Sequence, residues 1–140
     1  MKNLWRRHSL AVLSFVVPFL ITGFGWKFWL FKEEYLSLQT YREDIYVPFA
    51  FGSLVVQAIF WTYLTYLYLE KTSFMGLSIR IYALSAPLGL SYAVFTIGAK
   101  HVMSSVSGFA TLEVPFILIT HLSISILISA CYTLRGKPSL

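Results

Sequence analysis

Four long apolar stretches constrain this chain more than any other feature of its sequence. They cover about residues 10–31, 45–69, 77–99 and 112–134 of the 140 residues. A helix needs about 20 apolar residues to cross a bilayer, and the bilayer core accepts only helices or closed barrels because it offers the backbone no hydrogen-bond partners. The stretches lack the alternation of barrel strands. We therefore predict an all-α integral membrane protein, a four-transmembrane-helix bundle that forms one domain over residues 1–140.

The composition supports this class and excludes a nucleic-acid partner. Hydrophobic residues make up 57% of the chain and charged residues only 12%, against about 25% charged in an ordinary soluble domain. The net charge of +5 comes from Lys and Arg residues that stand singly or in pairs at the ends of apolar stretches. Nucleic-acid binding needs a continuous basic face. We therefore expect membrane lipids, and no nucleic acid, around this chain.

The distribution of Lys and Arg predicts the orientation. Cytoplasmic ends of membrane helices carry an excess of these residues. Seven lie on the side of the two termini and four on the opposite side. The first group is Lys2, Arg6, Arg7, Lys71, Arg80, Arg135 and Lys137, and the second is Lys27, Lys32, Arg42 and Lys100. We predict that both termini are cytoplasmic.

Small and polar residues recur at helical spacing on three of the four stretches. Helices associate in a bilayer through close backbone approach and hydrogen bonds between helices, so such residues mark contacts. We expect the three stripes to face one another at the centre of the bundle, as packing surfaces. They are Ser53 and Gln57 on the second stretch, Ser85, Gly89 and Ala93 on the third, and His121, Ser125 and Ser129 on the fourth.

His121 is the most informative polar residue, because ionisable groups inside a membrane helix are rare and costly. It lies about 12 Å along its helix from Glu113, at a depth similar to that of Gln57. Two interpretations stay open. His121 is satisfied by a hydrogen bond between helices, or it lines a ligand pocket in the outer half of the bundle together with Gln57, Tyr92 and Thr96.

Lys100, His101 and Glu113 flank the connection between the third and fourth stretches. We expect Lys100 and Glu113 to pair across this connection at the membrane surface, with Glu113 favoured by the helix dipole. The alternative is that all three contribute to the ligand site. The histidines and the glutamate form no i, i+4 ligand pair, so we predict no metal site. The sequence identifies no cofactor.

The connection after the first stretch, "KEEYLSLQTYRED", spaces Tyr35, Leu38 and Tyr41 three residues apart. This spacing favours a short helix that lies on the membrane with these side chains towards the lipid. A tight polar loop is the alternative.

No catalytic residue can be assigned. The single cysteine, Cys131, forms no redox pair, which argues against disulfide chemistry. Acidic residues do not face each other on two stretches, so a carboxylate dyad is excluded. Many serines are present, but no spacing singles one out as a nucleophile.

Three segments carry a resemblance: "SLVVQAIFWTYLTYLY" (53–68), "LGLSYAVFTIGAKH" (88–101) and "LEVPFILITH" (112–121). Together they resemble an uncharacterised family of small four-helix bacterial inner-membrane proteins. The resemblance covers about the last three helices. It implies the four-helix architecture and a location in the bacterial inner membrane, and it implies no chemistry.

These features predict an interaction protein rather than an enzyme. The first hypothesis is an accessory subunit of a membrane complex or a self-associating bundle, with a protein partner or a second copy. The alternative is a small carrier or a protein that binds lipid or a small molecule in the outer polar pocket. A membrane enzyme ranks third.

Overall fold

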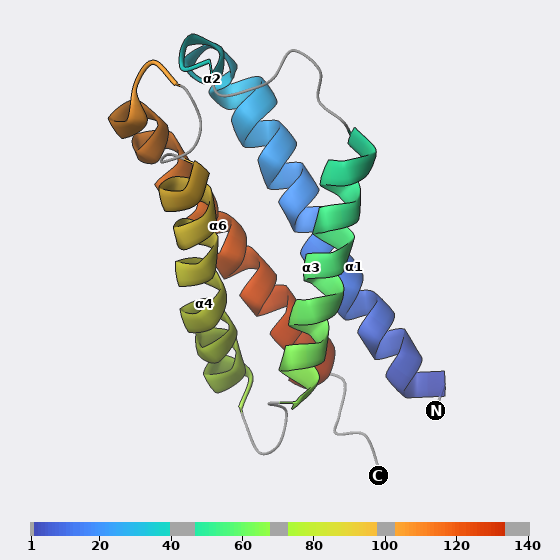
Figure 1. Ribbon diagram of the computed structural model, residues 1–140. Helices are drawn as coiled ribbons and strands as arrows, with labels where there is room; N and C mark the ends of the chain where they lie inside the picture. The colour runs from blue at the N-terminus through green and yellow to red at the C-terminus, as the bar shows by residue number, and fades with distance from the viewer. Residues whose placement is uncertain (1, 40–46, 68–72, 98–102, 134–140) are drawn as a thin grey trace.

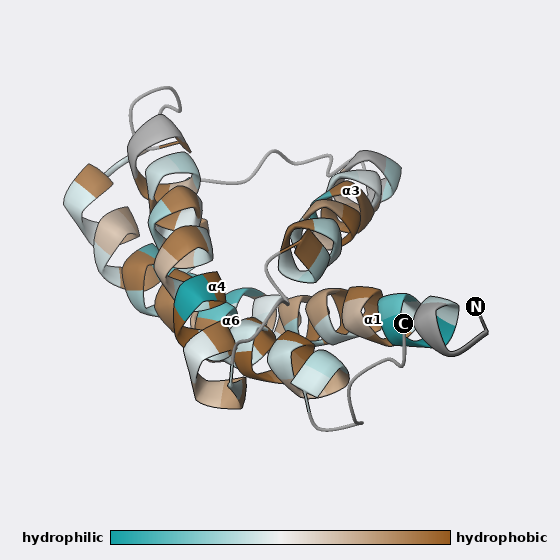
Figure 2. Ribbon diagram, turned by 90° about the horizontal axis from the view of Figure 1, so that it is seen from below, coloured by the Kyte–Doolittle hydropathy of each residue, from teal (hydrophilic) through white to brown (hydrophobic). Residues whose placement is uncertain are grey.

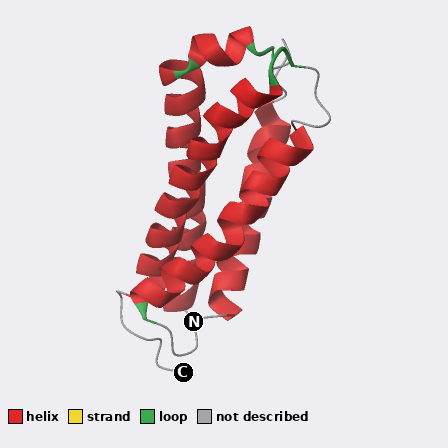
Figure 3. Ribbon diagram, turned by 90° about the vertical axis from the view of Figure 1, so that its left-hand side faces the viewer, coloured by secondary structure: helices red, strands yellow, loops and turns green. Residues whose placement is uncertain are grey.

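The computed structural model describes residues 2–39, 47–67, 73–97 and 103–133. The described part of the chain is built from helices joined by short connections (Figure 3). In chain order they are α1 (Lys2–Gly25), η1 (Trp26–Leu30), α2 (Lys32–Ser37), α3 (Val47–Leu67), α4 (Phe74–Leu90), η2 (Ser91–Thr96) and α6 (Val106–Thr133). The two η segments are π-helical continuations of α1 and α4.

The predicted number of long apolar helices is confirmed. Four helices are long and apolar enough to cross a membrane: Trp5–Leu30, Ala50–Leu67, Phe74–Val94 and Val106–Thr133. Three of them begin earlier than hydropathy indicated, at Trp5, Phe74 and Val106, and serine caps account for the last two. The hydroxyl of Ser73 accepts a hydrogen bond from the amide of Gly76, and the hydroxyl of Ser105 accepts one from the amide of Gly108. Such serine caps set helix starts independently of hydropathy.

Helix α6 is the central element of the bundle. It packs against α1 on one side and against α4 on the other, whereas α3 packs mainly on α1 (Figure 1). Seen from the end where α1 begins and α6 ends, α3 stands apart from α4 (Figure 2). We call this the terminal end, and the opposite one the α2 end. The helices therefore pack in the order α3, α1, α6 and α4.

The packing face of α3 differs from the prediction. Its buried side chains are Leu54, Ala58, Trp61, Thr62 and Thr65, which follow helical spacing along one face. Leu54, Ala58 and Trp61 belong to a core with Ala11 and Phe15 of α1 and with Ile124, Ile128 and Tyr132 of α6. The second-stretch stripe, Ser53 and Gln57, is instead exposed. The expectation that it faces the centre was wrong, because this larger apolar face turns inward.

The other two stripes do meet, between α4 and α6. Ser85, Ala93, Ser125 and Ser129 are buried. A methyl group placed on Gly89 would lie 2.6 Å from Nε2 of His121 and 3.0 Å from Cγ2 of Ile117. A side chain at this position would therefore force the imidazole ring of α6 to shift, because the space is already filled.

Helix α2 lies across the α2 end of the bundle. Tyr35 and Leu38 are buried with Phe109 of α6, and the carbonyl of Leu38 accepts a hydrogen bond from the amide of Ser104. The expected short helix is present, but its apolar side chains point into the protein rather than into lipid. Tyr41 lies outside the described residues.

We expect Gly89→Ala to lower the free energy of unfolding by about 1–3 kcal/mol, the usual cost of overpacking a filled core. His121→Ala should relieve the collision. The double variant should therefore lose less free energy of unfolding than the sum of the two single losses. Denaturant titration in detergent would measure this coupling. Gly23→Ala is the matched control, since nothing lies within 4 Å of its added methyl group. Purely additive effects would contradict the contact.

Candidate functional site

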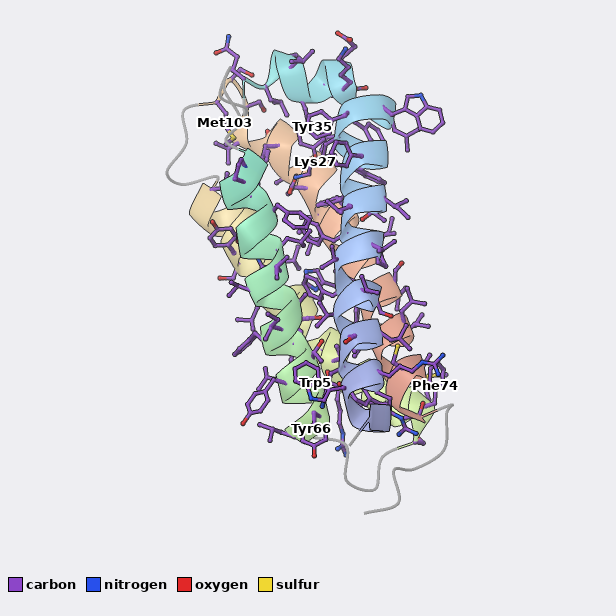
Figure 4. All side chains as sticks on the ribbon, turned by 90° about the vertical axis from the view of Figure 1, so that its right-hand side faces the viewer. Trp5, Lys27, Tyr35, Tyr66, Phe74 and Met103 are labelled. Carbon is purple, nitrogen blue, oxygen red and sulfur yellow. The ribbon has the colours of Figure 1, made fainter. Side chains whose placement is uncertain are left out.

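The most unusual group in the bundle is the carboxylate of Glu113, which is 2% exposed. Its Oε1 atom lies 2.5 Å from Nζ of Lys27 in η1. Its Oε2 atom accepts a hydrogen bond of 2.7 Å from the hydroxyl of Tyr35 in α2. Lys27 and Tyr35 lie close together at the α2 end (Figure 4). One carboxylate of α6 thus holds both η1 and α2.

The π-helical turn of η1 brings the Lys27 side chain to this place. The amide of Phe31 donates to the carbonyl of Trp26, five residues earlier, which is the wide hydrogen-bond pattern of a π-helix. The indole of Trp26 donates a hydrogen bond of 3.2 Å to the carbonyl of Leu112 on α6. Two consecutive residues of η1 therefore attach to two consecutive residues of α6.

Aromatic rings complete the surroundings of the ammonium group. Nζ of Lys27 lies 4.5 Å from the centroid of Phe116 and 5.4 Å from that of Tyr35. Both distances lie within the range of a cation–π interaction. The Lys27 side chain is 19% exposed and that of Glu113 only 3%. A charged pair is thus enclosed by rings, with little access for water.

This arrangement is suited to holding segments together rather than to catalysis. Both carboxylate oxygens have a partner, and the charge of Glu113 is compensated by Lys27. A buried network whose members are all satisfied makes a site rigid and specifies one arrangement. Among the described residues, no group of three His, Cys, Asp or Glu side chains could hold a metal ion.

The sequence predicted Lys100 as the partner of Glu113 and did not identify Lys27 or Tyr35. Lys100 and His101 lie outside the described residues, and the described partners are Lys27 and Tyr35. A signal was present in the sequence. Lys27 lies near the end of the first stretch, and Glu113 lies near the start of the fourth, so both belong to the same side of the bundle. A lysine at such a depth needs a counter-charge.

His121 is buried at 5% exposure, beside Gly89 and Ile117. Its Nδ1 atom has no hydrogen-bond partner. The hydroxyl of Thr120, the preceding residue, is 3.0 Å from that of Thr22 on α1. Two neighbouring polar residues of α6 therefore point to opposite partners, Thr120 to α1 and His121 to α4.

The structure does not bring Gln57 and Tyr92 to His121. Gln57 is exposed, and its amide donates a hydrogen bond of 3.2 Å to Ser53 on the same helix. Tyr92 is 67% exposed. The backbone of Thr96 ends η2, and its side chain is outside the described set. Of the predicted site residues, Glu113 and His121 are buried within the bundle, and they contact different neighbours.

Comparisons with known protein families, with curated proteins and with solved structures found no match to this chain. The resemblance noted in the sequence stays a prediction.

We expect Lys27→Met to lower the free energy of unfolding by about 3–5 kcal/mol, because it leaves Glu113 buried without its counter-charge. The double variant Lys27→Met, Glu113→Gln should recover most of this loss, since it removes both charges. Tyr35→Phe should cost less, about 1–2 kcal/mol for one hydrogen bond. Unfolding titrations in detergent would measure all three.

The control for this series is Glu33→Gln, which removes an exposed carboxylate on α2. Exposed substitutions usually change stability by less than about 0.5 kcal/mol. Equal effects of Glu33→Gln and Lys27→Met would contradict the role assigned to the buried pair.

Proposed function

We propose that this chain is an integral membrane protein that works by interaction, and that a second copy of the chain docks on the exposed face of α3. In this proposal the four apolar helices span a membrane, the bacterial inner membrane, with both termini in the cytoplasm. We define the α3 face by Gly52, Ser53, Val56, Gln57 and Phe60, all of which are exposed.

The observation that carries the proposal is the position of Gln57. It lies ten residues after Val47 in a helix of 21 residues, which is about 15 Å along a helix of about 31 Å. An exposed amide at this position would face the middle of the hydrocarbon layer. One of its donors reaches Ser53 within α3. Polar side chains at this depth promote association of helices, because a protein partner can supply hydrogen bonds that lipid cannot.

A second copy can supply hydrogen-bond partners to this face. A glutamine side chain carries both donors and an acceptor, so two Gln57 side chains can bond to each other across a two-fold axis. Such an axis brings the same surface of both copies together. Nothing lies within 4 Å of a methyl group placed on Gly52, so the backbone of another helix can approach closely at this position.

The carrier hypothesis has less support from the geometry. It required Gln57, Tyr92 and His121 to line one pocket. Gln57 and Tyr92 are exposed, whereas His121 is enclosed by Gly89 and Ile117. An accessory role beside a different protein uses the same α3 face, and the experiment below separates it from self-association.

Val56→Cys in a Cys131→Ala background should form disulfide-linked dimers in native membranes. Adding Gln57→Leu should weaken the association. Hydrogen bonds between membrane helices contribute about 0.6–2 kcal/mol, so we expect a dissociation constant roughly 3- to 30-fold higher. Cross-linking yield against dilution in lipid would measure it.

Ile79→Cys is the matched control, because Ile79 is 59% exposed, on α4. It should yield few dimers. A product that joins Val56→Cys to a different protein would identify an accessory subunit instead. Equal yields from the two cysteine positions, or no effect of Gln57→Leu, would contradict docking through the α3 face.

A further inference from the structure

The opening between α3 and α4 forms a groove in the half of the bundle nearer the terminal end. Its cavity volume is about 350 Å³. Eight residues line it: Trp61, Leu64 and Thr65 of α3, and Leu77, Arg80, Ile81, Ala83 and Leu84 of α4. Trp61 and Leu64 of α3 also belong to one hydrophobic cluster with Leu77 and Ile81 of α4.

The groove wall is suited to hydrocarbon. Six of the eight lining residues are apolar or aromatic. The hydroxyl of Thr65 donates a hydrogen bond of 2.7 Å to the carbonyl of Trp61 within α3, so this polar group is already satisfied. Arg80 is the one lining residue with a charge. The groove therefore combines an apolar wall with a single cationic side chain.

The groove extends over residues 77–84 of α4, or about 10 Å along the helix. A single flexible hydrocarbon chain is thinner than a helix and can follow the space between Leu64 and Leu84.

The position of Arg80 matches the surface layer of a bilayer. It lies six residues after Phe74, where α4 begins, or about 9 Å along the helix axis. A long arginine side chain can reach from this depth to the headgroups. Trp5, Tyr66 and Phe74 lie at this same end (Figure 4).

The described carboxylates lie at one end of the bundle, whereas cationic side chains lie at both. Glu33, Glu34 and Glu113 belong to the α2 end, together with Lys27 and Lys32. Arg6 and Arg7 stand in the first turns of α1, at the same end as Arg80. Among the described residues, the charged side chains at the end of Arg80 are therefore cationic.

We propose that the α3–α4 groove binds one acyl chain of an anionic phospholipid from the surrounding bilayer, with Arg80 contacting the phosphate. A guanidinium carries five N–H donors, so Arg80 can contact a phosphate beside the interaction that it already makes within the chain, while the acyl chain fills the apolar wall. This site lies beside the α3 face but does not depend on self-association.

The test is native mass spectrometry of the full chain released from nanodiscs that hold equal amounts of phosphatidylglycerol and phosphatidylcholine with identical acyl chains. The wild type should retain phosphatidylglycerol preferentially. Arg80→Gln should reduce this retention about ten-fold, the effect of about 1.4 kcal/mol in binding. Ala83→Trp should reduce retention of both lipids, because the indole would occupy the groove.

Arg6→Gln is the matched control, since it removes a charge at the same end outside the groove. It should retain phosphatidylglycerol as the wild type does. Equal retention of both lipids, equal losses from Arg80→Gln and Arg6→Gln, or capture of a free fatty acid instead would overturn the proposal. Helical content by circular dichroism would confirm that each variant is folded, and cross-linking at Val56→Cys would report self-association separately.

Discussion

The buried carboxylate of Glu113 organises the α2 end of the molecule. Without Lys27 and Tyr35 it would be a charge in a nearly dry environment, and such a charge costs several kcal/mol. With them, one side chain of α6 fixes η1 and α2 in single positions. Tyr35 and Leu38 pack against Phe109 of α6 at the same end.

In a bilayer, apolar side chains gain little by leaving lipid for protein, so helices stay together where polar bonds and close backbone contacts connect them. The contacts of α6 with its neighbours meet this condition. Thr22 and Thr120 connect α1 to α6, and Gly89 accommodates His121 between α4 and α6. Helix α3 is different, because the hydrogen bonds from Gln57 to Ser53 and from Thr65 to Trp61 stay within the helix.

Hydropathy was sufficient to predict four apolar helices, because crossing hydrocarbon requires a length that the sequence displays directly. It could not predict their starts at Phe74 and Val106, which depend on the caps of Ser73 and Ser105. Small-residue spacing correctly indicated contacts at Gly89 but not at Ser53. On α3 almost every face is apolar, so the pattern alone could not decide which one turns inward. The sequence places Lys27 and Glu113 at the same end of two stretches, but it does not show the π-helical turn in which Lys27 stands.

The two ends of the bundle therefore differ for one physical reason. At the α2 end, the ion pair connects segments from α1, α2 and α6, and the space between them is filled. Towards the terminal end, where α3 ends at Leu67 and α4 begins at Phe74, the two helices line the α3–α4 groove. In the lipid-binding proposal, an acyl chain of the surrounding bilayer fills this groove and contacts α3 and α4 together, with Arg80 beside its phosphate.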